Sequence, residues 1–583
     1  MQLEDTMAGP PELTAATTAT GSAATQPRNP WPVLVIILSA VFMQLLDTTI
    51  TMVAVPTIQT SLKASYGEVQ LVVALYMLAF ACVLVTGGRL GDTYGRKKMF
   101  LWGMVGFTIA SAACGAAPNI VTLIAARVVQ GMSSGLMFPQ VLGIIQVIFS
   151  KAQRTKAITF YGATIGLATI LGPVTGGALI GLNLGGSGWR SIFYVNVPIG
   201  LAALALGLAM IPESRAEKAS RIDVTGALLL GAGLFLLVLP MVIGRDNGWP
   251  AWSFACMAIS PFVLAAFIAY ERGRTRRDAG PLIDTSLFRQ RPFTVGLLAS
   301  LVFFTGIPSF FMVLLITLQG GLGYSPVKAG AVTLGFALAL AIGSARSAAA
   351  ARRLGSRILV AGCLLMLIGE SSVIAVMYWQ GTSLAGWQLL LPLFVAGIGG
   401  GFFLAPVTNV VLAGIPAKDA GAASGALATA QQVGAAIGIA AAGVIFFGLI
   451  GHNAGGSSAS ALPRLRADLA AAGLPAPAQQ QVAARFQTCF NDRAHAKDPA
   501  SIPASCAVIA RQIAASPATA QVKAKVAAAV QNTAVPAARR YDLEHSMRTT
   551  LDWQLGVFFL TMLLVARLPK VKLDGDALMP GGA

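Results

Sequence analysis

The sequence predicts an all-α, polytopic membrane protein, and three observations support this prediction. Of the 583 residues, 55% are hydrophobic and only 11% are charged, well below the charged fraction of about 25% that is typical of soluble domains. Runs of about twenty apolar residues recur along almost the whole chain, and each can cross a hydrocarbon core of roughly 30 Å. The runs lack the alternation of barrel strands, which leaves helices as the spanning element.

Fourteen apolar runs are long enough to be transmembrane helices. Their approximate bounds are 32–55, 69–88, 98–115, 120–148, 156–181, 192–211, 223–243, 252–270, 292–318, 326–346, 358–378, 387–414, 421–450 and 549–567. Polar basic linkers at 212–222 and 271–291 divide these helices into groups of six, two and six. The resulting domains are a leader at 1–30, a six-helix bundle at 31–212, two additional helices within 213–291, a second six-helix bundle at 292–567 and a tail at 568–583.

A weak internal repeat indicates that the two bundles are equivalent. A shift of 260 residues places Pro32 on Pro292 and Gly95 on Gly355, at the same points in the helix order. Repeated bundles are common in secondary transporters, where the substrate binds between them near the midplane of the membrane.

The net charge of +18 comes mostly from basic residues in every second loop. They are Arg89, Arg96, Lys97 and Lys98, then Lys151, Arg154 and Lys156, then Arg272, Arg274, Arg276 and Arg277, and finally Arg352, Arg353 and Arg357. These loops share one side of the membrane if the helices alternate in direction, and an excess of Lys and Arg marks the cytoplasmic side. Both termini are therefore expected in the cytoplasm. No nucleic-acid partner is expected, because the charge forms no single stripe.

Two long segments fall outside the apolar runs. The leader at 1–30 lacks the basic start and cleavage site of a signal peptide, so we expect it to be disordered and the first helix to be retained. Topology places the Ala-rich segment 452–548 outside the cytoplasm. We interpret it as a solvated cap or a disordered connector, with partner docking as the alternative. Its stretches 465–472 and 521–530 could form short amphipathic helices.

The six cysteines fall into two groups. Cys82, Cys114, Cys256 and Cys363 lie within apolar runs, where cysteine behaves as a small apolar residue. Cys489 and Cys506 lie in segment 452–548, on the side of the membrane where disulfides persist. We expect these two cysteines to pair.

Three ionisable residues lie deep inside apolar runs, namely Asp47, Arg127 and Glu370. An embedded charge costs roughly 3 kcal/mol or more, so each is a candidate functional residue. Burial favours the neutral form of a carboxyl, so Asp47 could bind and release protons as access alternates. Arg127 stays protonated and would bias the protonation of a nearby carboxylate or hold a hydrogen-bond network. A structural role is the alternative for all three, with equal weight for Glu370.

The loop after the second predicted helix holds the most specific pattern in the chain. Its sequence is Gly88-Arg89-Leu90-Gly91-Asp92-Thr93-Tyr94-Gly95-Arg96-Lys97-Lys98. Glycines allow a tight crossing between helices, Asp92 can cap or pair with a neighbouring helix end, and the basic residues stay at the anionic membrane surface. The spacing closely resembles the signature loop of the major facilitator superfamily.

Other matches to this family follow in the family's order. They are Leu46-Asp47-Thr48-Thr49-Ile50, Arg127 with Gln130-Gly131, Gly166 with Gly172-Pro173 and Gly176-Gly177, Gly188-Trp189-Arg190, and Asn196-Val197-Pro198. Together they resemble the fourteen-helix drug:proton antiporter branch over about residues 31–450 and the last helix. The resemblance implies proton coupling or recognition of cationic substrates at Asp47. It also implies conformational gating by the signature loop (Gly88, Asp92, Gly95, Arg96) and by the fifth helix (Gly166, Gly172, Pro173, Gly176, Gly177).

The fifth predicted helix is expected to be a conformational element. Gly162 and Gly166, then Gly172 and Gly176, recur at one-turn spacing, which permits close approach of another backbone, and Pro173 permits a bend. The resemblance implies that this helix lies between the two halves and restricts leak. Ordinary packing of small residues in a membrane bundle is the alternative.

The second half departs from the pattern of the first. The position that aligns with Asp47 is Ile307, and Arg352 aligns with Asp92. We therefore expect the coupling chemistry to be concentrated in the first half.

These features predict a proton-coupled exporter of small amphipathic or cationic compounds, a multi-pass protein of the bacterial cytoplasmic (inner) membrane that works by alternating access. A lipid, a dedicated metabolite or an amino acid are alternative substrates, and a periplasmic accessory protein is a conceivable partner. The sequence has no P-loop, so neither ATP nor another cofactor is expected. The spans hold no metal cluster or nucleophile and base pair that would indicate an enzyme. A receptor or scaffold acting through segment 452–548 is the alternative from another class.

Overall fold

The computed structural model describes residues 29–215, 223–277, 280–380, 383–412, 415, 420–496, 503–515 and 519–568. All regular secondary structure in these residues is helical, which confirms the all-α prediction. Fourteen helices among them are long and apolar enough to cross a membrane, the number expected. The described residues do not include the leader up to residue 28, residues 216–222 or the tail from residue 569. The expectation of a disordered leader therefore falls outside the described residues.

The spans form two bundles and an additional pair. The first bundle comprises α1 (Trp31–Leu62), α2 (Tyr66–Tyr94), α3 (Arg96–Ala116), α4 (Ile120–Ile148), α5 (Lys151–Leu182), and η2 (Gly188–Arg190), α6 (Ser191–Tyr194) and α7 (Asn196–Met210), which together make the sixth span. The additional helices are α8 (Val224–Ile243) and α9 (Ala251–Arg276). The second bundle comprises α10 (Arg291–Ile316), α11 (Pro326–Leu354), α12 (Arg357–Gln380), α13 (Leu390–Leu412), α14 (Ala420–Ala471) and α18 (Val535–Ala566).

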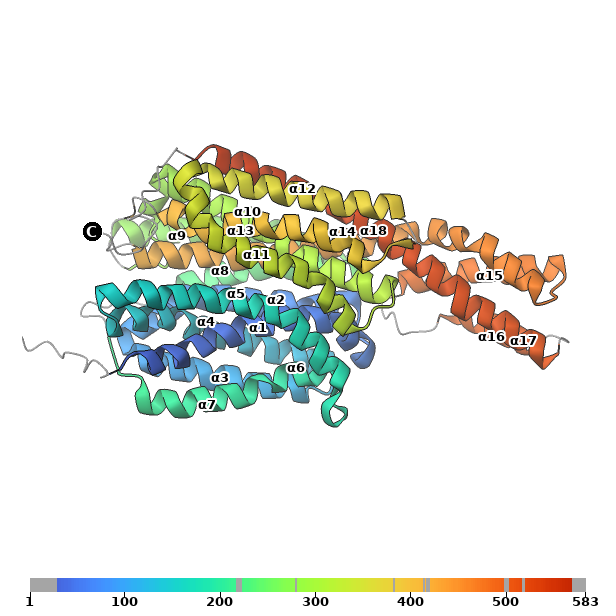
Figure 1. Cartoon of the computed structure of the whole chain (residues 1–583), viewed down its shortest axis with the longest axis horizontal. Helices are drawn as coiled ribbons and strands as arrows, with labels where there is room; N and C mark the ends of the chain where they lie inside the picture. Colours follow the sequence, from blue (N-terminus) through green and yellow to red (C-terminus); the bar gives the residue numbers. More distant parts are fainter. Residues whose placement is uncertain are drawn as a thin grey trace, which may run out of the picture.

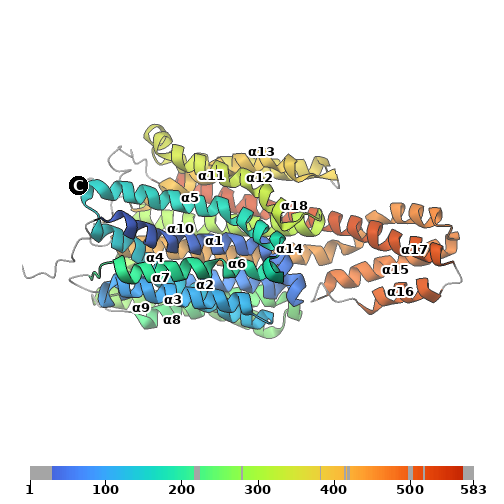
Figure 2. The same ribbon diagram turned by 60° about the horizontal axis from the view of Figure 1, so that its bottom comes forward.

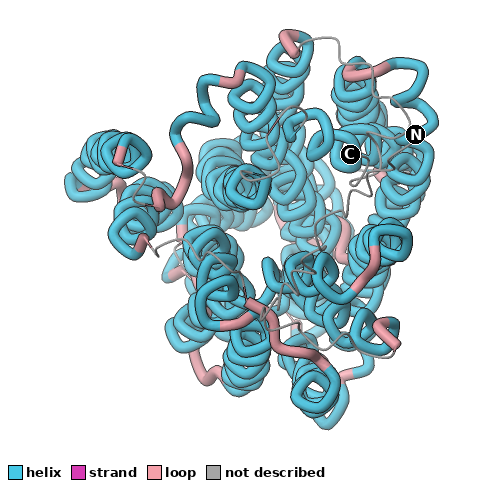
Figure 3. Tube along the Cα trace, turned by 90° about the vertical axis from the view of Figure 1, so that its left-hand side faces the viewer, coloured by secondary structure: helices cyan, strands magenta, loops and turns pink. Residues whose placement is uncertain are grey.

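The two bundles lie side by side with their helices roughly parallel to one long axis (Figure 1, Figure 2). We call the end at which α1 begins and α2 ends the inner end, and the opposite end the outer end. Figure 3 looks onto the inner end, where the spans are seen nearly end-on. Successive helices alternate in direction, so the basic loops that follow α2, α4, α9 and α11 all lie at the inner end.

The structure gives the internal repeat a physical basis. Pro32 and Pro292 stand in the first turn of α1 and α10, where proline costs no hydrogen bond. Gly95 and Gly355 end α2 and α11 with φ of 115° and 58°, and each donates its N–H to the carbonyl four residues earlier. A positive φ favours glycine, so the same residue closes the same helix in both bundles.

The outer segment is a helical appendage rather than a disordered connector, over the residues described. α14 continues unbroken to Ala471, past the end of its apolar run, and α15 (Ala476–His495), α16 (Ala504–Ala515), α17 (Ala520–Ala528) and the π-helical turn η8 (Ala529–Ala534) return the chain to α18. The stretch 465–472 is thus the end of a long helix, and 521–530 spans α17 and the start of η8. Buried apolar side chains at helical spacing, such as Leu465, Leu469, Phe486 and Phe490, give the appendage its own core, which explains why it is ordered despite its Ala-rich composition.

Candidate coupling site and bundle interface

Asp47 lies on α1 at the centre of a buried polar network in the first bundle. The residue is 1% exposed, and one carboxylate oxygen forms an ion pair with Arg127 of α4, which is fully buried. The other oxygen accepts hydrogen bonds from Gln130 Nε2 at 2.9 Å and from Asn196 Nδ2 at 3.1 Å. Three residues from α4 and α7 therefore surround the buried carboxylate of Asp47 on α1.

Arg127 contacts residues of three helices, α1, α2 and α4. Its Nε donates to the backbone oxygen of Val72 on α2 at 3.1 Å, and its Nη1 donates to Gln130 Oε1 at 2.6 Å as well as to Asp47. The guanidinium carbon lies 4.0 Å from the ring centroid of Tyr76, close enough for a cation–π interaction. Arg127 Nη2 has no hydrogen-bond partner among the described residues, so the network is not saturated.

The sequence identified Asp47 and Arg127 separately, and the structure brings them into contact. Arg127 contacts the Asp47 carboxylate directly, while the binding and release of a proton by Asp47 stays a prediction. Gln130 and Asn196 were seen only as motif positions without a role. The spacing of Arg127 and Gln130, three residues apart on one helix face, was the available signal.

The signature loop packs tightly at the inner end. Asp92 forms an ion pair with Arg96, in the first turn of α3, at 2.8 Å. Pairing with a neighbouring helix end was one of the two expectations for Asp92. A Cβ on Gly95 would lie 2.5 Å from Glu213 Oε1, so glycine is required there by space as well as by φ. Gly88 is less restricted, since its nearest neighbour would be Pro139 Cβ at 3.6 Å.

The outer half of α5 contacts both α1 and the second bundle. A Cβ on Gly172 would lie 1.8 Å from Thr49 Oγ1, two residues after Asp47 in α1. A Cβ on Gly177 would lie 2.7 Å from both the Pro326 oxygen and Val327 Cα of α11. The reciprocal contact is equally close, since a Cβ on Gly330 of α11 would lie 2.4 Å from the Pro173 oxygen.

The inner half of α5 differs, and here one expectation is wrong. A Cβ on Gly162 or Gly166 would meet nothing within 4 Å, so these two glycines mediate no close approach in this conformation. Gly176 does mediate a close approach, because a Cβ on this residue would lie 3.1 Å from Ile50 Cγ1. The difference arises because the bundles touch through the outer half of this helix.

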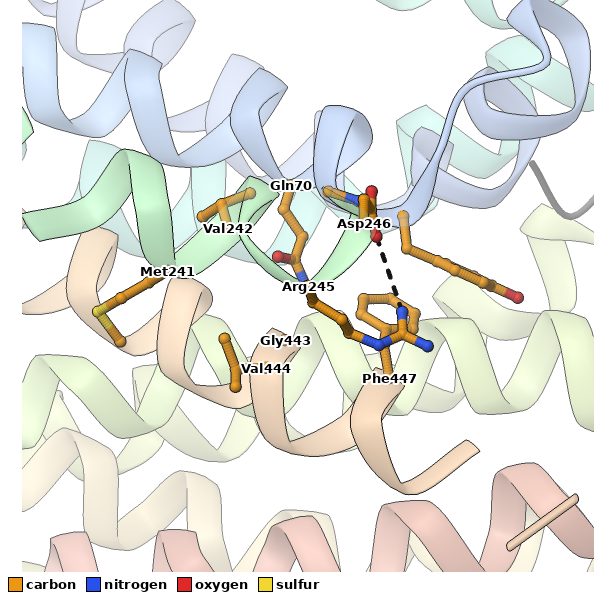
Figure 4. A pocket seen from close by; sticks show the side chains of 10 residues that line it. Gln70, Met241, Val242, Arg245, Asp246, Gly443, Val444 and Phe447 are labelled. Atoms are coloured by element: carbon orange, nitrogen blue, oxygen red, sulfur yellow. Dashed lines mark hydrogen bonds and ion pairs between the residues drawn. The ribbon is translucent and has the colours of Figure 1, made fainter. Parts of the chain in front are cut away.

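A second contact closes the outer end between α2 and α14. Tyr66 stacks on Phe447 with ring centroids 4.2 Å apart, and a Cβ on Gly443 would lie 1.6 Å from Gln70 Nε2. Figure 4 shows the small pocket between these helices, where Arg245 pairs with Asp246 at 3.8 Å. Asp246 also accepts the N–H of Gly67 at 2.9 Å, which fixes the start of α2.

The two bundles are thus joined at their outer halves, and the first bundle contains an embedded ion pair. The family model described as Major Facilitator Superfamily matches residues 37–439. The chain belongs to the Major Facilitator Superfamily. It is 38% identical to the probable actinorhodin transporter of Streptomyces coelicolor over 82% of each chain. It is 35% identical to the tetracenomycin C resistance and export protein of Streptomyces glaucescens over 73% of this chain and 77% of that protein. These relatives place the chain in the drug-efflux branch of the superfamily.

A solved structure supports the facilitator fold. A bacterial homologue of the human lysosomal transporter Spinster, crystallised in an inward-facing and occupied conformation, has a TM-score of 0.58 with 15% sequence identity. The alignment covers 93% of this chain and 98% of that one. The chain is thus a multi-pass membrane protein with the major facilitator fold.

Two further expectations concern residues outside the Asp47 network, namely Glu370 and the cysteine pair of the appendage. Glu370, on α12 of the second bundle, is 1% exposed, and neither carboxyl oxygen has a hydrogen-bond partner among the described residues. It is not part of the Asp47 network. In the appendage, Cys489 and Cys506 form a disulfide with a Cα–Cα distance of 4.7 Å, which links α15 to α16.

Proposed function

We propose that this facilitator exports small amphipathic or cationic compounds across the bacterial cytoplasmic membrane in exchange for protons. The observation that supports this most directly is the buried Asp47–Arg127 pair, a carboxylate that a proton can neutralise inside a membrane-spanning bundle. The printed names of the relatives, which include an export protein and multidrug resistance proteins, support the direction and the substrate class. A dedicated exporter of a lipid, metabolite or amino acid is the alternative.

In this mechanism a proton and Arg127 compete for Asp47. Protonation removes the negative charge and weakens the ion pair, so Arg127 turns to Gln130 and the Val72 carbonyl, both of which it already contacts. Loss of the proton restores the pair. Arg127 is then a modulator that never carries the transported proton, since a guanidinium stays charged in proteins.

A continuous path of contacts connects this centre to the bundle interface. Thr49 and Ile50 follow Asp47 on α1 and pack against Gly172 and Gly176 of α5, and Gly177 packs against α11. A small rotation of α1 on protonation would therefore change how α5 seats against the second bundle. This path supports α5 as the gating helix, together with the signature loop at the inner end.

We infer that the conformation described is closed at the outer end. α5 meets α11 there without room for a single added Cβ, while a Cβ on Gly162 or Gly166, in the inner half of α5, would meet nothing within 4 Å. The basic loops indicate that the inner end faces the cytoplasm, and the appendage disulfide fits an oxidising compartment outside it. Substrate would then enter from the cytoplasm in this state.

The appendage supports a secondary role in contacting other proteins. It has its own core and disulfide and extends beyond the membrane-spanning helices (Figure 1). A periplasmic accessory protein that receives the substrate is the partner we propose for it. A receptor or scaffold function alone would leave the embedded Asp47 network without a purpose.

The decisive experiment uses purified protein in liposomes with an imposed proton gradient and ethidium as the amphipathic cation. Asp47→Asn keeps the shape of the side chain but removes the exchangeable proton, so gradient-driven accumulation should fall to background. Asp468→Asn, on the appendage, is the matched control and should behave as wild type. Undiminished gradient-driven transport by Asp47→Asn would remove Asp47 from the mechanism. Ethidium movement that ignores the gradient in the wild type would refute proton coupling itself.

A further inference from the structure

A second buried pair of acids lies at the inner end of the additional helices. Asp223 stands immediately before α8 and caps it, accepting the Gly226 N–H at 2.8 Å. Glu271 lies near the end of α9 and accepts the Ile283 N–H at 3.0 Å. Both residues are 1% exposed. No sequence pattern predicts this pair, because each acid borders a polar linker, where a carboxylate is usually solvated.

The two carboxyl groups face each other across Gly226. A Cβ on Gly226 would lie 2.4 Å from Glu271 Oε1 and 2.9 Å from Asp223 Oδ2. Glu271 Oε1 has no hydrogen-bond partner among the described residues, and Asp223 Oδ2 lies 3.0 Å from Arg274 Nε in an ion pair. The remaining oxygen of each group accepts a backbone N–H. If both groups are ionised, both facing oxygens are acceptors, so neither carboxyl group can donate a hydrogen bond to the other.

We propose that Asp223 and Glu271 share one proton and form a proton-binding site at the inner end of the additional helices. A proton between the two oxygens converts the repulsion of two buried carboxylates into a hydrogen bond, which is the usual outcome when two acids occupy one site. The proposal concerns these residues alone and holds whether or not the protein exchanges protons for drugs.

Charged and polar side chains from several elements surround the two acids. Arg274 Nε lies 3.0 Å from Asp223 Oδ2, and the Tyr270 hydroxyl donates to Asp223 Oδ1 at 3.3 Å. Arg89 of the signature loop adds a positive charge from α2, with Asp92 of the same helix close to it. Asp284, in the segment before α10, turns its carboxylate to the Ser286 N–H at 2.8 Å instead.

The shared proton sets the charge at the point where the second half of the chain is joined to α9 and to the signature loop. Glu271 holds the backbone of Ile283, and Arg89 donates to the carbonyl oxygens of Gly280 and Pro281, so the start of the second half is tied to α9 and to the signature loop. When the proton is bound, one charge remains and the tie is intact. As the pH rises and the proton leaves, a second negative charge appears beside the first at the point where segment 280–283 is held.

Infrared titration of the purified full-length protein tests this directly, without substrate or gradient. A protonated carboxyl absorbs at a higher frequency than a carboxylate, so the shared proton gives a band that disappears at alkaline pH. Asp223→Asn and Glu271→Gln should each remove this same band, and the double variant should remove nothing more. Asp284→Asn is the matched control and should leave the band unchanged. A band that persists in both single variants, or two separate bands each lost with one residue, would overturn the proposal.

A measurement on the unmodified protein keeps the test valid if those variants fold poorly. Carbodiimides react with protonated carboxyls in apolar surroundings, and mass spectrometry of the peptides locates the modified residue. We expect modification of Asp223 or Glu271, never of both in one molecule, and a decline at alkaline pH. Simultaneous modification of both, or of neither at any pH, contradicts a shared proton. Normal labelling together with failed ethidium transport would refute only the exporter proposal.

Discussion

The two bundles hold their buried acids in opposite ways. In the first bundle, Asp47 is surrounded by a guanidinium and two side-chain amides. In the second, Glu370 is equally buried but has no hydrogen-bond partner among the described residues. Burying an isolated charge in such a site costs far more free energy than burying a neutral polar group. For the neutral group, the missing hydrogen bonds cost about 1–3 kcal/mol. The comparison shows a carboxyl group with a cation and two amides around it in the first bundle, and one without such partners among the described residues in the second.

The difference lies in the side chains and not in the framework. Equivalent prolines begin α1 and α10, and equivalent glycines end α2 and α11. Yet Ile307 occupies the place of Asp47 in the second bundle. In the proposed mechanism, protonation would act on the first bundle, and the second would respond through the contact between α5 and α11.

The largest effect is expected when the charged centre loses its cation. Arg127→Met leaves Asp47 buried without a counter-charge, and breaking a buried pair in this way costs about 3–5 kcal/mol of stability. Asp47 can avoid the cost only by remaining protonated, and in both cases gradient-driven export should fall to background. Thermal unfolding in detergent and the liposome assay measure the two consequences. Arg464→Met on the appendage is the control, and wild-type export by Arg127→Met would show that the pair is only structural.

Sequence patterns were sufficient for properties of a single helix and for the Cys489–Cys506 disulfide, but not for contacts between membrane-spanning helices. Apolar runs were enough to predict fourteen spans, and an ionisable residue within such a run was enough to single out Asp47, Arg127 and Glu370. The partnership of Asp47 and Arg127 joins residues 80 positions apart, and no spacing rule connects them. Which of the three would be paired was therefore visible only in the fold.

The glycines of α5 and the pair Asp223 and Glu271 show the same limit. Gly166 and Gly177 are alike in sequence, but only Gly177 meets the second bundle, because contact depends on how the bundles are tilted. Asp223 and Glu271 border linkers that looked solvated. Their burial follows from the packing of α8 on α9, which hydropathy does not describe.

An intermediate effect is expected at the interface through which the bundles communicate. Gly177→Val places methyl groups against the α11 backbone, and overpacking of this kind costs about 1–3 kcal/mol. The cost falls only on the conformation closed at the outer end, so the equilibrium should shift toward the open one by roughly 5- to 150-fold. Spin-label distances between the outer ends of α5 and α11 would measure this shift. Gly162→Val in the same helix is the matched control, since its side chain meets open space, and equal behaviour of the two variants would refute the gate.

The smallest effect is expected at Glu370, and it decides whether coupling is confined to one bundle. Glu370→Gln replaces the buried carboxyl group by an amide of nearly the same shape, so the melting temperature and the export rate should stay close to wild type. The number of protons moved per ethidium, obtained from the potential at which net transport reverses, should also be unchanged. A lower proton number with intact folding would instead assign Glu370 a transported proton. The unpaired acid of the second bundle would then be a second coupling site, and the proposed asymmetry between the bundles would be lost.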